Sequence, residues 1–430
     1  MLDLDTIRTR TEEVRQNCAH RRIDADVDAV LRLAGERSNL IQETERMRAR
    51  RNELSGRIPK ASETDRPGLV QEAQALKADI AEKEQALAEV EGRLRDEQAK
   101  IPNLTHPDAP VGEDTSANRQ LRRWGEVPEF DFEPKDHVAL GEALDLLDFD
   151  SATKVTGSDF YFLKNEAVLL DLALERFALD VLREKDYTLH ATPDLARMDV
   201  LEGTGFNPRG EESQIYRIAG QDLGLIATAE VTLGGLLKDE ILPAGALPLR
   251  YGGLSHCFRV ESGAYGRAGR GLYRVHQFTK VEMFAFTLPE QSEAMHEEML
   301  AVEEDIYQRL GLPYRVVDIC TGDLGGPAYR KFDLEAWMPG RGEGGAWGEI
   351  TSASNCTDYQ ARRLAIRFRR QQGAKPELVH TLNGTAVAVS RTLLAILENY
   401  QQADGAVLVP EVLRPLCGLE RIGPRNAGDA

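Results

Sequence analysis

The N-terminal quarter of the chain carries the hydrophobic pattern of paired helices. In residues 30–58, and again in residues 69–101, seam positions recur at alternating steps of three and four residues. That spacing keeps one side of a helix against a partner. A polar, proline-containing break at residues 59–67 separates the two stretches, so the pattern predicts an antiparallel helical hairpin. At 1.5 Å per residue, each helix would be roughly 45–50 Å long.

The pattern alone leaves two uses of such a hairpin open. Heptads of this kind most often join two copies of a chain in a coiled coil. The alternative is an arm that reaches along a large partner, because arginines crowd the far third of the first helix and Lys60 lies at the tip. These arginines could follow a phosphate backbone or form an ordinary solvated face. They are Arg46, Arg48, Arg50 and Arg51.

The composition excludes several classes of protein. The five cysteines lie far apart without a C-x-x-C pair, which argues against a disulfide scaffold or a zinc ribbon and fits a reducing, cytoplasmic compartment. Residues 1–22 are charged and lack an apolar core, so no secretory signal is expected. No apolar run approaches the ~20 residues that span a bilayer. The formal net charge is −18, so any contact with RNA must come from a local basic surface.

Beyond the hairpin, the sequence predicts an α+β domain. Residues 254–259 and 276–286 have the character of strands on either side of a glycine- and arginine-rich loop. Apolar and charged residues alternate over 363–369, which predicts a further strand, and residues 392–400 have a helical pattern. Consecutive strands joined by hairpins favour an antiparallel β-sheet flanked by helices.

Composition also divides the chain into segments. The stretch after the hairpin is rich in Pro, Asp and Gly, which is typical of a linker. The C-terminal end is short, polar and bears Gly and Pro, so we expect disorder there. The expected segments are an N-terminal domain with the hairpin arm (1–105), a linker (106–135), a larger domain (136–418) and the tail (419–430).

One motif places an arginine and a glutamate at the end of a predicted strand. The run C-F-R-V-E ends at Glu261 and is followed by the glycine-rich loop and by K-V-E at 280–282. On a strand, Arg259 and Glu261 would share a face, and a guanidinium there can fork onto a phosphate or carboxylate. The loop adds Arg267 and Arg270, which suits a polyphosphate or a nucleic-acid end. For this stretch alone, an ordinary surface hairpin with salt bridges is the favoured interpretation.

A second motif places an arginine at a strand-to-helix junction. The run T-L-N-G-T at 381–385 leads to Arg391 and to a helix that ends L-E-N at 397–399. This pattern resembles motif 3 of class II aminoacyl-tRNA synthetases. The F-R-V-E strand, its loop and the K-V-E strand resemble motif 2 of the same class.

Three further segments narrow the resemblance to one family. The run T-P-D-L at 192–195 lies where motif 1 and its dimer-interface proline would fall. With T-A-E at 228–230 and S-N-C-T-D at 354–358, the chain resembles the seryl-tRNA synthetase family from residue 1 to about residue 418. The resemblance includes the hairpin arm. It implies the class II antiparallel sheet as the fold of the larger domain.

The resemblance implies an ATP site. In the family, the motif 2 arginine (Arg259) grips the α-phosphate and the serine carboxylate, an aromatic (Phe278) stacks on adenine, and the motif 3 arginine (Arg391) covers the other face. Glu349 and Ser352 would hold Mg²⁺ together with the phosphates. The expected catalytic residues are Arg259, Arg391 and Glu349. The implied ATP-binding residues are Arg259, Glu261, Val275, Phe278, Glu349, Ile350, Thr351, Ser352 and Arg391.

The resemblance also implies a serine site. Glu282 and Thr385 would meet the hydroxyl and ammonium groups of the amino acid. Such a site rejects alanine by roughly 10⁴-fold or more, because its buried polar groups are then left unpaired. The family more often has serine in place of Thr385 and glycine in place of Ala386 and Ser390, so we expect activity with reduced serine affinity. The implied serine-binding residues are Thr228, Glu230, Arg259, Glu282, Asn383 and Thr385.

These implications define an expected reaction and two rivals. A cytoplasmic homodimer would activate L-serine with ATP to seryl-adenylate and transfer the seryl group to tRNA(Ser), and also to tRNA(Sec); no zinc and no membrane partner are expected. One rival is a synthetase-like ligase that charges a carrier protein, but such relatives lack the arm. The other is an inactive coiled-coil scaffold, which predicts loss of Arg259, Glu282 or Arg391. The implied tRNA-binding residues are Arg46, Arg48, Arg50, Arg51, Arg267 and Arg270.

Overall fold

A computed structural model describes residues 1–206, 214–261 and 271–424 of the chain. The chain divides into two compact units, Met1–Leu104 and Thr105–Ala430. In the ranges that the structure describes, no helix is long and apolar enough to cross a membrane. The arginines Arg267 and Arg270 of the glycine-rich loop lie outside those ranges.

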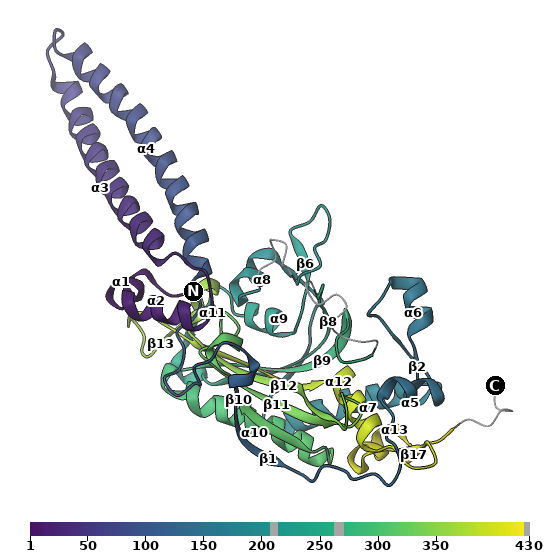
Figure 1. Ribbon diagram of the computed structural model, residues 1–430. Coiled ribbons are helices and arrows are strands. Elements are labelled where there is room, and N and C mark those ends of the chain that lie inside the picture. The colour runs from purple at the N-terminus through teal and green to yellow at the C-terminus, as the bar shows by residue number, and fades with distance from the viewer. Residues whose placement is uncertain (207–213, 262–270, 425–430) are drawn as a thin grey trace. The chain divides into compact units, whose positions relative to one another are not determined.

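The N-terminal unit contains the predicted hairpin (Figure 1). Its long helices are α3 (Val27–Arg57) and α4 (Arg66–Lys100), preceded by the short helices α1 (Leu4–Thr9) and α2 (Thr11–His20). The carboxylate of Asp26 caps α3 by accepting a hydrogen bond from the backbone N–H of Ala29 at 2.8 Å. Pro67 lies in the first turn of α4, where its missing N–H costs no hydrogen bond. The prediction of an antiparallel hairpin is confirmed.

The apolar seam and a set of ion pairs hold α3 against α4. Buried side chains near the base of the hairpin, Leu33 on α3 and Leu94 on α4 among them, belong to one core cluster. Farther along the helices, Thr44, Leu54 and Ile80 are also buried. Ion pairs cross between the helices along their exposed edges. They are Arg37–Glu91, Lys83–Glu43, Arg48–Glu84 and Arg50–Glu72.

The second unit is built on a large sheet that is antiparallel except at one edge. In the described residues its eight strands lie in the order β1-β10-β11-β12-β15-β9-β8-β4, and only the β4–β8 pair is parallel. The expected class II fold is confirmed. The strands are β1 (Arg119–Trp124), β10 (Tyr314–Asp318), β11 (Arg330–Met338), β12 (Ala346–Thr357), β15 (His380–Ala388), β9 (Gln277–Thr287), β8 (Leu249–Phe258) and β4 (Thr188–Ala191).

Side chains of the central strand β9 alternate between two environments. Val281, Met283 and Ala285 project into the main core cluster, whereas Phe284 and Phe286 belong to a separate cluster on the other side. Three helices supply the main cluster and cover that face of the sheet: α7 (Glu166–Glu184), α10 (Ser292–Arg309) and α12 (Val389–Asn399). The even-numbered positions of β9 therefore project from the opposite face, where Phe284 and Phe286 are apolar and Lys280 and Glu282 are charged.

Shorter elements frame the opposite face and the ends of the sheet. The additional helices are α5 (His137–Ala143), α6 (Phe149–Thr156), α8 (Met198–Thr204), α9 (Glu230–Gly235), α11 (Tyr359–Leu364) and α13 (Arg414–Cys417). The additional strands are β2 (Leu147–Asp148), β3 (Phe162–Leu163), β5 (Leu195–Arg197), β6 (Leu223–Leu225), β7 (Ile241–Pro243), β13 (Arg367–Arg369), β14 (Glu377–Leu378), β16 (Val407–Leu408) and β17 (Arg421–Ile422). Helices α9 and α11 pack on β9 and β15 respectively.

Three details of the sequence analysis differ from the structure. The expected linker at 106–135 contains β1, which pairs with β10 at an edge of the main sheet. The expected strand over 363–369 begins as the end of α11, and Ala365 then adopts a left-handed conformation before β13. The expected disordered tail contains β17, which pairs with β16 and buries Ile422. In each case tertiary contacts overrode the local composition or pattern.

Candidate functional site

A pocket opens where the end of β8 meets β9, β12, β15 and the start of α12. Most of the residues expected to bind ATP line it, together with Thr385 from the expected serine site. Ser352 is absent from the described lining. The lining residues are Arg259, Glu261, Tyr273, Arg274, Val275, Phe278, Lys280, Glu349, Ile350, Thr351, Thr385, Ala388, Ser390 and Arg391.

Arg259 and Glu261 both reach this pocket, but not by the predicted alternation on a strand. Strand β8 ends at Phe258, and Glu261 has a positive φ of 52°. The chain turns there, so the two side chains are not placed by the pleat. Glu261 pairs with Arg274, and the guanidinium carbon of Arg259 lies 5.2 Å from the centroid of the Phe278 ring. The Phe278 ring therefore carries a cation on one face.

Arg391 is held in the pocket by an aromatic ring and by an acid. Its guanidinium pairs with the Glu349 carboxylate at 3.1 Å and donates to the Glu349 carbonyl at 3.0 Å. Its Nε donates to the carbonyl of Tyr273 at 3.1 Å, and its Cζ lies 4.6 Å from the Tyr273 ring centroid. The Cζ atom of Arg341 lies 4.2 Å from the centroid of the same ring. The sequence analysis did not identify Tyr273 or Arg341, because they come from separate segments with no common motif.

A β-bulge brings Glu349 and Ser352 to one face of β12. Asp333 and Glu335 of β11 face Ser352 and Glu349 respectively, while the ladder skips Ile350. Asp333 and Glu335 are two residues apart and so project from one face, and their partners do the same. In a regular strand without the bulge, positions 349 and 352, which are three residues apart, would point in opposite directions. The bulge thus aligns the two expected metal ligands.

These oxygen donors fit a Mg²⁺ ion that arrives with phosphate. The Glu349 side chain is 43% exposed. Burial acts to raise its pKa, but the positive charges of Arg391 and Lys331 outweigh that effect and hold the pKa below its ordinary value. Among the described residues, no group of three or more His, Cys, Asp or Glu could hold a metal ion. The remaining ligands would have to be phosphate oxygens and water, which is the usual coordination of nucleotide-bound magnesium.

Thr351 offers the pocket less than the sequence analysis expected. Its side chain is buried, and its hydroxyl donates to Glu303 of α10 at 2.7 Å. Burial raises the pKa of Glu303 well above its ordinary value. Thr351 therefore ties β12 to the helix layer, and its hydroxyl is directed away from a ligand.

The expected serine residues form a connected polar network beside the pocket. Glu230, at the start of α9, accepts hydrogen bonds from Gln360 at 2.7 Å and from Asn383 at 3.0 Å. The hydroxyl of Thr228 accepts from the backbone N–H of Glu230 at 3.1 Å. Burial and the neighbouring carboxylate of Glu282 raise the pKa of Glu230 to about 7. The network thus presents an acid that is easily ionised by an incoming cation.

Glu282 carries the other half of this network. It forms an ion pair with Lys280, two residues earlier on β9, and accepts from the Thr385 hydroxyl at 3.3 Å. Lys280 also donates to Thr385 at 3.3 Å. All three side chains are buried. No role for Lys280 was predicted from the K-V-E run, although its two-residue spacing from Glu282 already indicates that both lie on one face of a strand.

The departures from the family pattern lie in different surroundings. Ala386 belongs to the main core cluster beneath the sheet, so its methyl group packs against helices. Ser390 and Thr385 line the pocket itself. Ser390 and Thr385 can therefore affect substrate affinity directly, because their side chains line the pocket.

The arm arginines are less free than a simple basic strip. Arg48 pairs with Glu84 at 2.7 Å, and Arg50 pairs with Glu72 at 2.9 Å and with Glu53 at 3.0 Å. All of these side chains are about half exposed. Exposed pairs of this kind contribute about 0–1 kcal/mol each. A phosphate could therefore replace the glutamates at little cost.

The antiparallel sheet and its arginine-bearing pocket define a class II aminoacyl-tRNA synthetase core. The family model described as "tRNA synthetase class II core domain (G, H, P, S and T)" matches residues 215–400, and the "Seryl-tRNA synthetase N-terminal domain" matches residues 1–105. The chain belongs to the seryl-tRNA synthetase family. The resemblance drawn from the motifs is confirmed.

Curated and solved relatives are similar along the whole chain. The Serine--tRNA ligase of Rubrobacter xylanophilus is 61% identical and that of Treponema denticola 54% identical; the matches cover 99% and 98% of this chain, and 99% and 100% of those proteins. The crystal structure of seryl-tRNA synthetase from Pyrococcus horikoshii complexed with ATP has a TM-score of 0.90 at 41% identity, and the match covers 99% of this chain and all of that one. The arm is thus shared with relatives, which disfavours the carrier-protein ligase.

We expect Glu230→Gln to stabilise the serine-free protein at pH 8 by on the order of 1 kcal/mol. The folded pKa of about 7 lies above the ordinary 4.5, so ionising this acid destabilises the fold increasingly as the pH rises above 4.5. An amide keeps both hydrogen bonds and has no charge to bury. Heat-unfolding midpoints at pH 8 and near pH 4.5 measure the effect.

The two proteins should unfold at similar temperatures near pH 4.5, where the carboxyl is neutral in the folded state and only half ionised in the unfolded state. Glu297→Gln, an exposed substitution on α10, controls for the simple loss of a negative charge. An equal offset between Glu230→Gln and the wild type at both pH values would contradict this account.

Proposed function

We propose that the chain is a serine–tRNA ligase that uses ATP to activate L-serine and then charges tRNA(Ser). One observation carries the proposal. A single pocket holds Arg259, Glu349 and Arg391, and a buried network of Glu282 and Thr385 adjoins it. Charge-binding groups suited to a nucleotide thus lie next to groups suited to a small amino acid with a hydroxyl.

The first step forms seryl-adenylate without a protein nucleophile. A carboxylate oxygen of serine attacks the α-phosphorus of ATP, and the bond to the β-phosphate oxygen breaks, so that pyrophosphate leaves. Arg259 orients the serine carboxylate and the α-phosphate and neutralises charge between them. Arg391, fixed by Tyr273 and Glu349, supplies a second cation. Mg²⁺ held by Glu349 and Ser352 would add positive charge at the phosphates.

The position of Arg259 over Phe278 bears on nucleotide binding. The guanidinium occupies one face of the aromatic ring that is expected to stack on adenine. Adenine must therefore use the opposite face or displace the guanidinium toward the phosphates. We propose displacement, because it would place Arg259 where charge develops on the α-phosphate.

The buried network would select serine. Glu230 would bind the ammonium group, and Glu282 with Thr385 would bind the hydroxyl. Alanine would leave these groups unpaired in a buried site, which is why such sites discriminate strongly. In the second step, a ribose hydroxyl at the tRNA end attacks the seryl carbonyl carbon, and AMP leaves while the hydroxyl proton is released.

Exchange of labelled pyrophosphate into ATP tests the proposal. We expect exchange to depend on serine and to be weak with alanine, glycine or threonine. Arg259→Ala should lower kcat/KM for exchange by on the order of 10²-fold or more, because it removes charge stabilisation at the α-phosphate. Arg197→Ala, an exposed arginine on β5, is a matched control.

The outcomes separate the rival functions. Serine-dependent exchange without charging of tRNA(Ser) would support the carrier-protein ligase. No exchange with any amino acid would support the inactive scaffold and overturn the proposal. Charging assays with tRNA(Sec) test the second expected tRNA substrate. We also propose a cytoplasmic location, because serine, ATP and tRNA are all present there.

We propose that the arm in residues 1–105 binds the tRNA backbone through its arginines, and that residues 136–418 form the catalytic domain. Phosphates would displace Glu84 and Glu72 from Arg48 and Arg50. Because the acids already neutralise these arginines, the net gain per contact is small, and binding should depend on several contacts at once.

Replacing Arg46 and Arg51 by Ala should reduce the affinity for tRNA and the salt dependence of binding, with little effect on pyrophosphate exchange. Exchange needs no tRNA, so it reports on the catalytic domain alone. Glu84→Gln should act in the opposite direction, because it frees Arg48. Filter binding over a range of salt concentrations measures both effects. Parallel losses in exchange and tRNA binding would contradict a specific role of the arm.

We propose that a homodimer forms through α7 and the neighbouring edge strand β4. The side chains of Val168, Leu169 and Leu172 lie at helical spacing on α7 and are 40%, 44% and 55% exposed. Strand β4 is at an edge of the main sheet and exposes Leu189. Apolar side chains beside a sheet edge are typical of an interface rather than of a solvated surface. The T-P-D-L run of the expected motif 1 directly follows β4.

Leu172→Glu should convert the dimer into monomers, because it places a charge at the centre of this apolar surface. Sedimentation velocity measures the change in mass. Val111→Glu is the matched control, because the Val111 side chain is 65% exposed and lies outside α7 and β4. This substitution should leave the dimer intact. A wild-type chain that sediments as a monomer would overturn the proposal, and an unchanged dimer in Leu172→Glu would place the interface elsewhere.

A further inference from the structure

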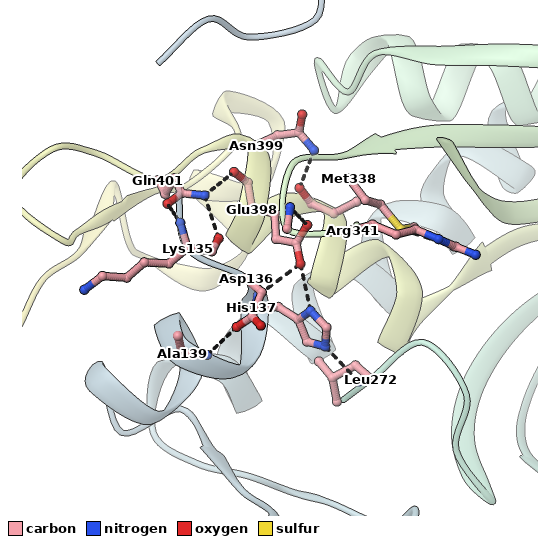
Figure 2. Close-up of polar contacts among 12 residues, drawn as sticks. Lys135, Asp136, His137, Ala139, Leu272, Met338, Arg341, Glu398, Asn399 and Gln401 are labelled. Atoms are coloured by element: carbon pink, nitrogen blue, oxygen red, sulfur yellow. Dashed lines mark hydrogen bonds and ion pairs between the residues drawn. The ribbon is translucent and has the colours of Figure 1, made fainter. Parts of the chain in front are cut away.

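A buried carboxylate on α12 gathers donors from two other parts of the chain. Glu398 lies two helical turns after Arg391, and its side chain is only 2% exposed. One of its oxygens accepts from the backbone N–H of His137 at 3.0 Å and contacts the ring Nδ1 of His137 at 2.8 Å. The other oxygen accepts from the backbone N–H of Gly340 at 2.8 Å. Figure 2 shows these contacts converging on Glu398.

The imidazole of His137 also connects Glu398 to a third segment of the chain. Its Nε2 accepts a hydrogen bond from the backbone N–H of Leu272 at 3.0 Å (Figure 2). A backbone N–H can only donate, so Nε2 must be the ring nitrogen without a proton. The proton is then on Nδ1, which donates to Glu398. His137 therefore acts as a neutral link between the carboxylate and Leu272.

Two glycines allow this close approach. A Cβ atom on Gly271 would lie 2.4 Å from Nε2 of His137, and Gly271 has a φ of 156°. A Cβ atom on Gly340 would lie 2.5 Å from Cα of Asp136 and 2.9 Å from the Glu398 carboxylate. No other residue fits either position without a shift of the backbone or of the side chain it meets. The contacts are thus built into the chain on both sides of the carboxylate.

Both anchored positions directly precede residues that meet at one side of the pocket. Leu272 precedes Tyr273, which lines the pocket, and Gly340 precedes Arg341, which contacts the Tyr273 ring. The guanidinium of Arg341 lies over the Tyr273 ring, and Arg391 contacts the same ring and donates to its carbonyl. Helix α12 therefore carries both Arg391 and Glu398. The segments that Glu398 holds in place are the ones that supply Tyr273 and Arg341.

We propose that His137 and Glu398 are positioning residues for ATP. They fix Tyr273 and Arg341, and through them they set the guanidinium of Arg391 where the nucleotide binds. Neither residue is among the described residues that line the pocket, so both act through others. The inference rests on the proposed function, because it assigns ATP to this pocket.

His137→Phe tests the link, because phenylalanine keeps the planar ring but removes both hydrogen bonds. We expect KM for ATP in pyrophosphate exchange, and Kd for ATP by calorimetry, to rise on the order of tenfold, with little change in KM for serine. Gln401→Leu is the matched control. Gln401 exchanges two hydrogen bonds with the backbone of Lys135, next to the same segment, and donates to the backbone carbonyl of Glu398. Within the described residues it makes no hydrogen bond to the Glu398 carboxylate, to Leu272 or to Gly340.

Gln401→Leu should lower the unfolding temperature as much as His137→Phe does, yet leave KM for ATP unchanged. His137→Gln should recover part of the ATP affinity, because its amide offers one acceptor and one donor at similar reach. Gly271→Ala disturbs the same contact from a partly exposed position and should reproduce the ATP defect even if His137→Phe fails to fold.

A double substitution makes the test specific. If Gly271 and His137 act through one contact, His137→Phe combined with Gly271→Ala should weaken ATP binding no more than the stronger single change. Additive effects, or an ATP affinity in His137→Phe equal to that of Gln401→Leu, would overturn the inference. A wild-type enzyme without serine-dependent exchange would instead overturn the proposed function, so the two failures are distinguishable.

Discussion

The alternation of side chains along β9 is the constraint on which the rest of the structure depends. Odd-numbered positions such as Val281 and Met283 bury apolar side chains against α7, α10 and α12. Even-numbered positions face the other way, so Lys280 and Glu282 gather on the side where the pocket opens. The same strand thus provides the core that fixes its position and the charges that act on a substrate. A shift of one residue in its register would exchange the two.

Much of the fold and part of the site could be predicted from local patterns. The hairpin followed from a seam that extends over many turns, and tertiary context changed neither helix. The β8–β9 hairpin and α12 also agreed with their predicted positions within a few residues. The two-residue spacing of Lys280 and Glu282 within one motif is by itself enough to place both on one strand face, because side chains alternate along a strand.

The remaining features depend on contacts between segments that have no common pattern in the sequence. Arg341 and Arg391 both contact the Tyr273 ring, although the three residues come from segments that are far apart in the chain. Nothing near Thr351 indicates that its hydroxyl bonds to Glu303 on α10. Strand β8 ends at Phe258 and Glu261 has a positive φ, so the predicted alternation does not apply to Arg259 and Glu261. Such details require the packed sheet, since they arise where separate elements meet.

The bulge at Ile350 has a consequence for how this segment can vary among related chains. It lets Glu349 and Ser352, which are three residues apart in sequence, project to the same side. A chain of the same length whose ladder ran regularly through Ile350 would keep both functional groups and yet turn one of them into the helix layer. Loss of Ile350 would instead leave the two residues at a spacing of two, which a regular strand also holds on one face. At this position the register of the backbone, more than the identity of the side chain at 350, therefore determines whether both oxygens lie on one face.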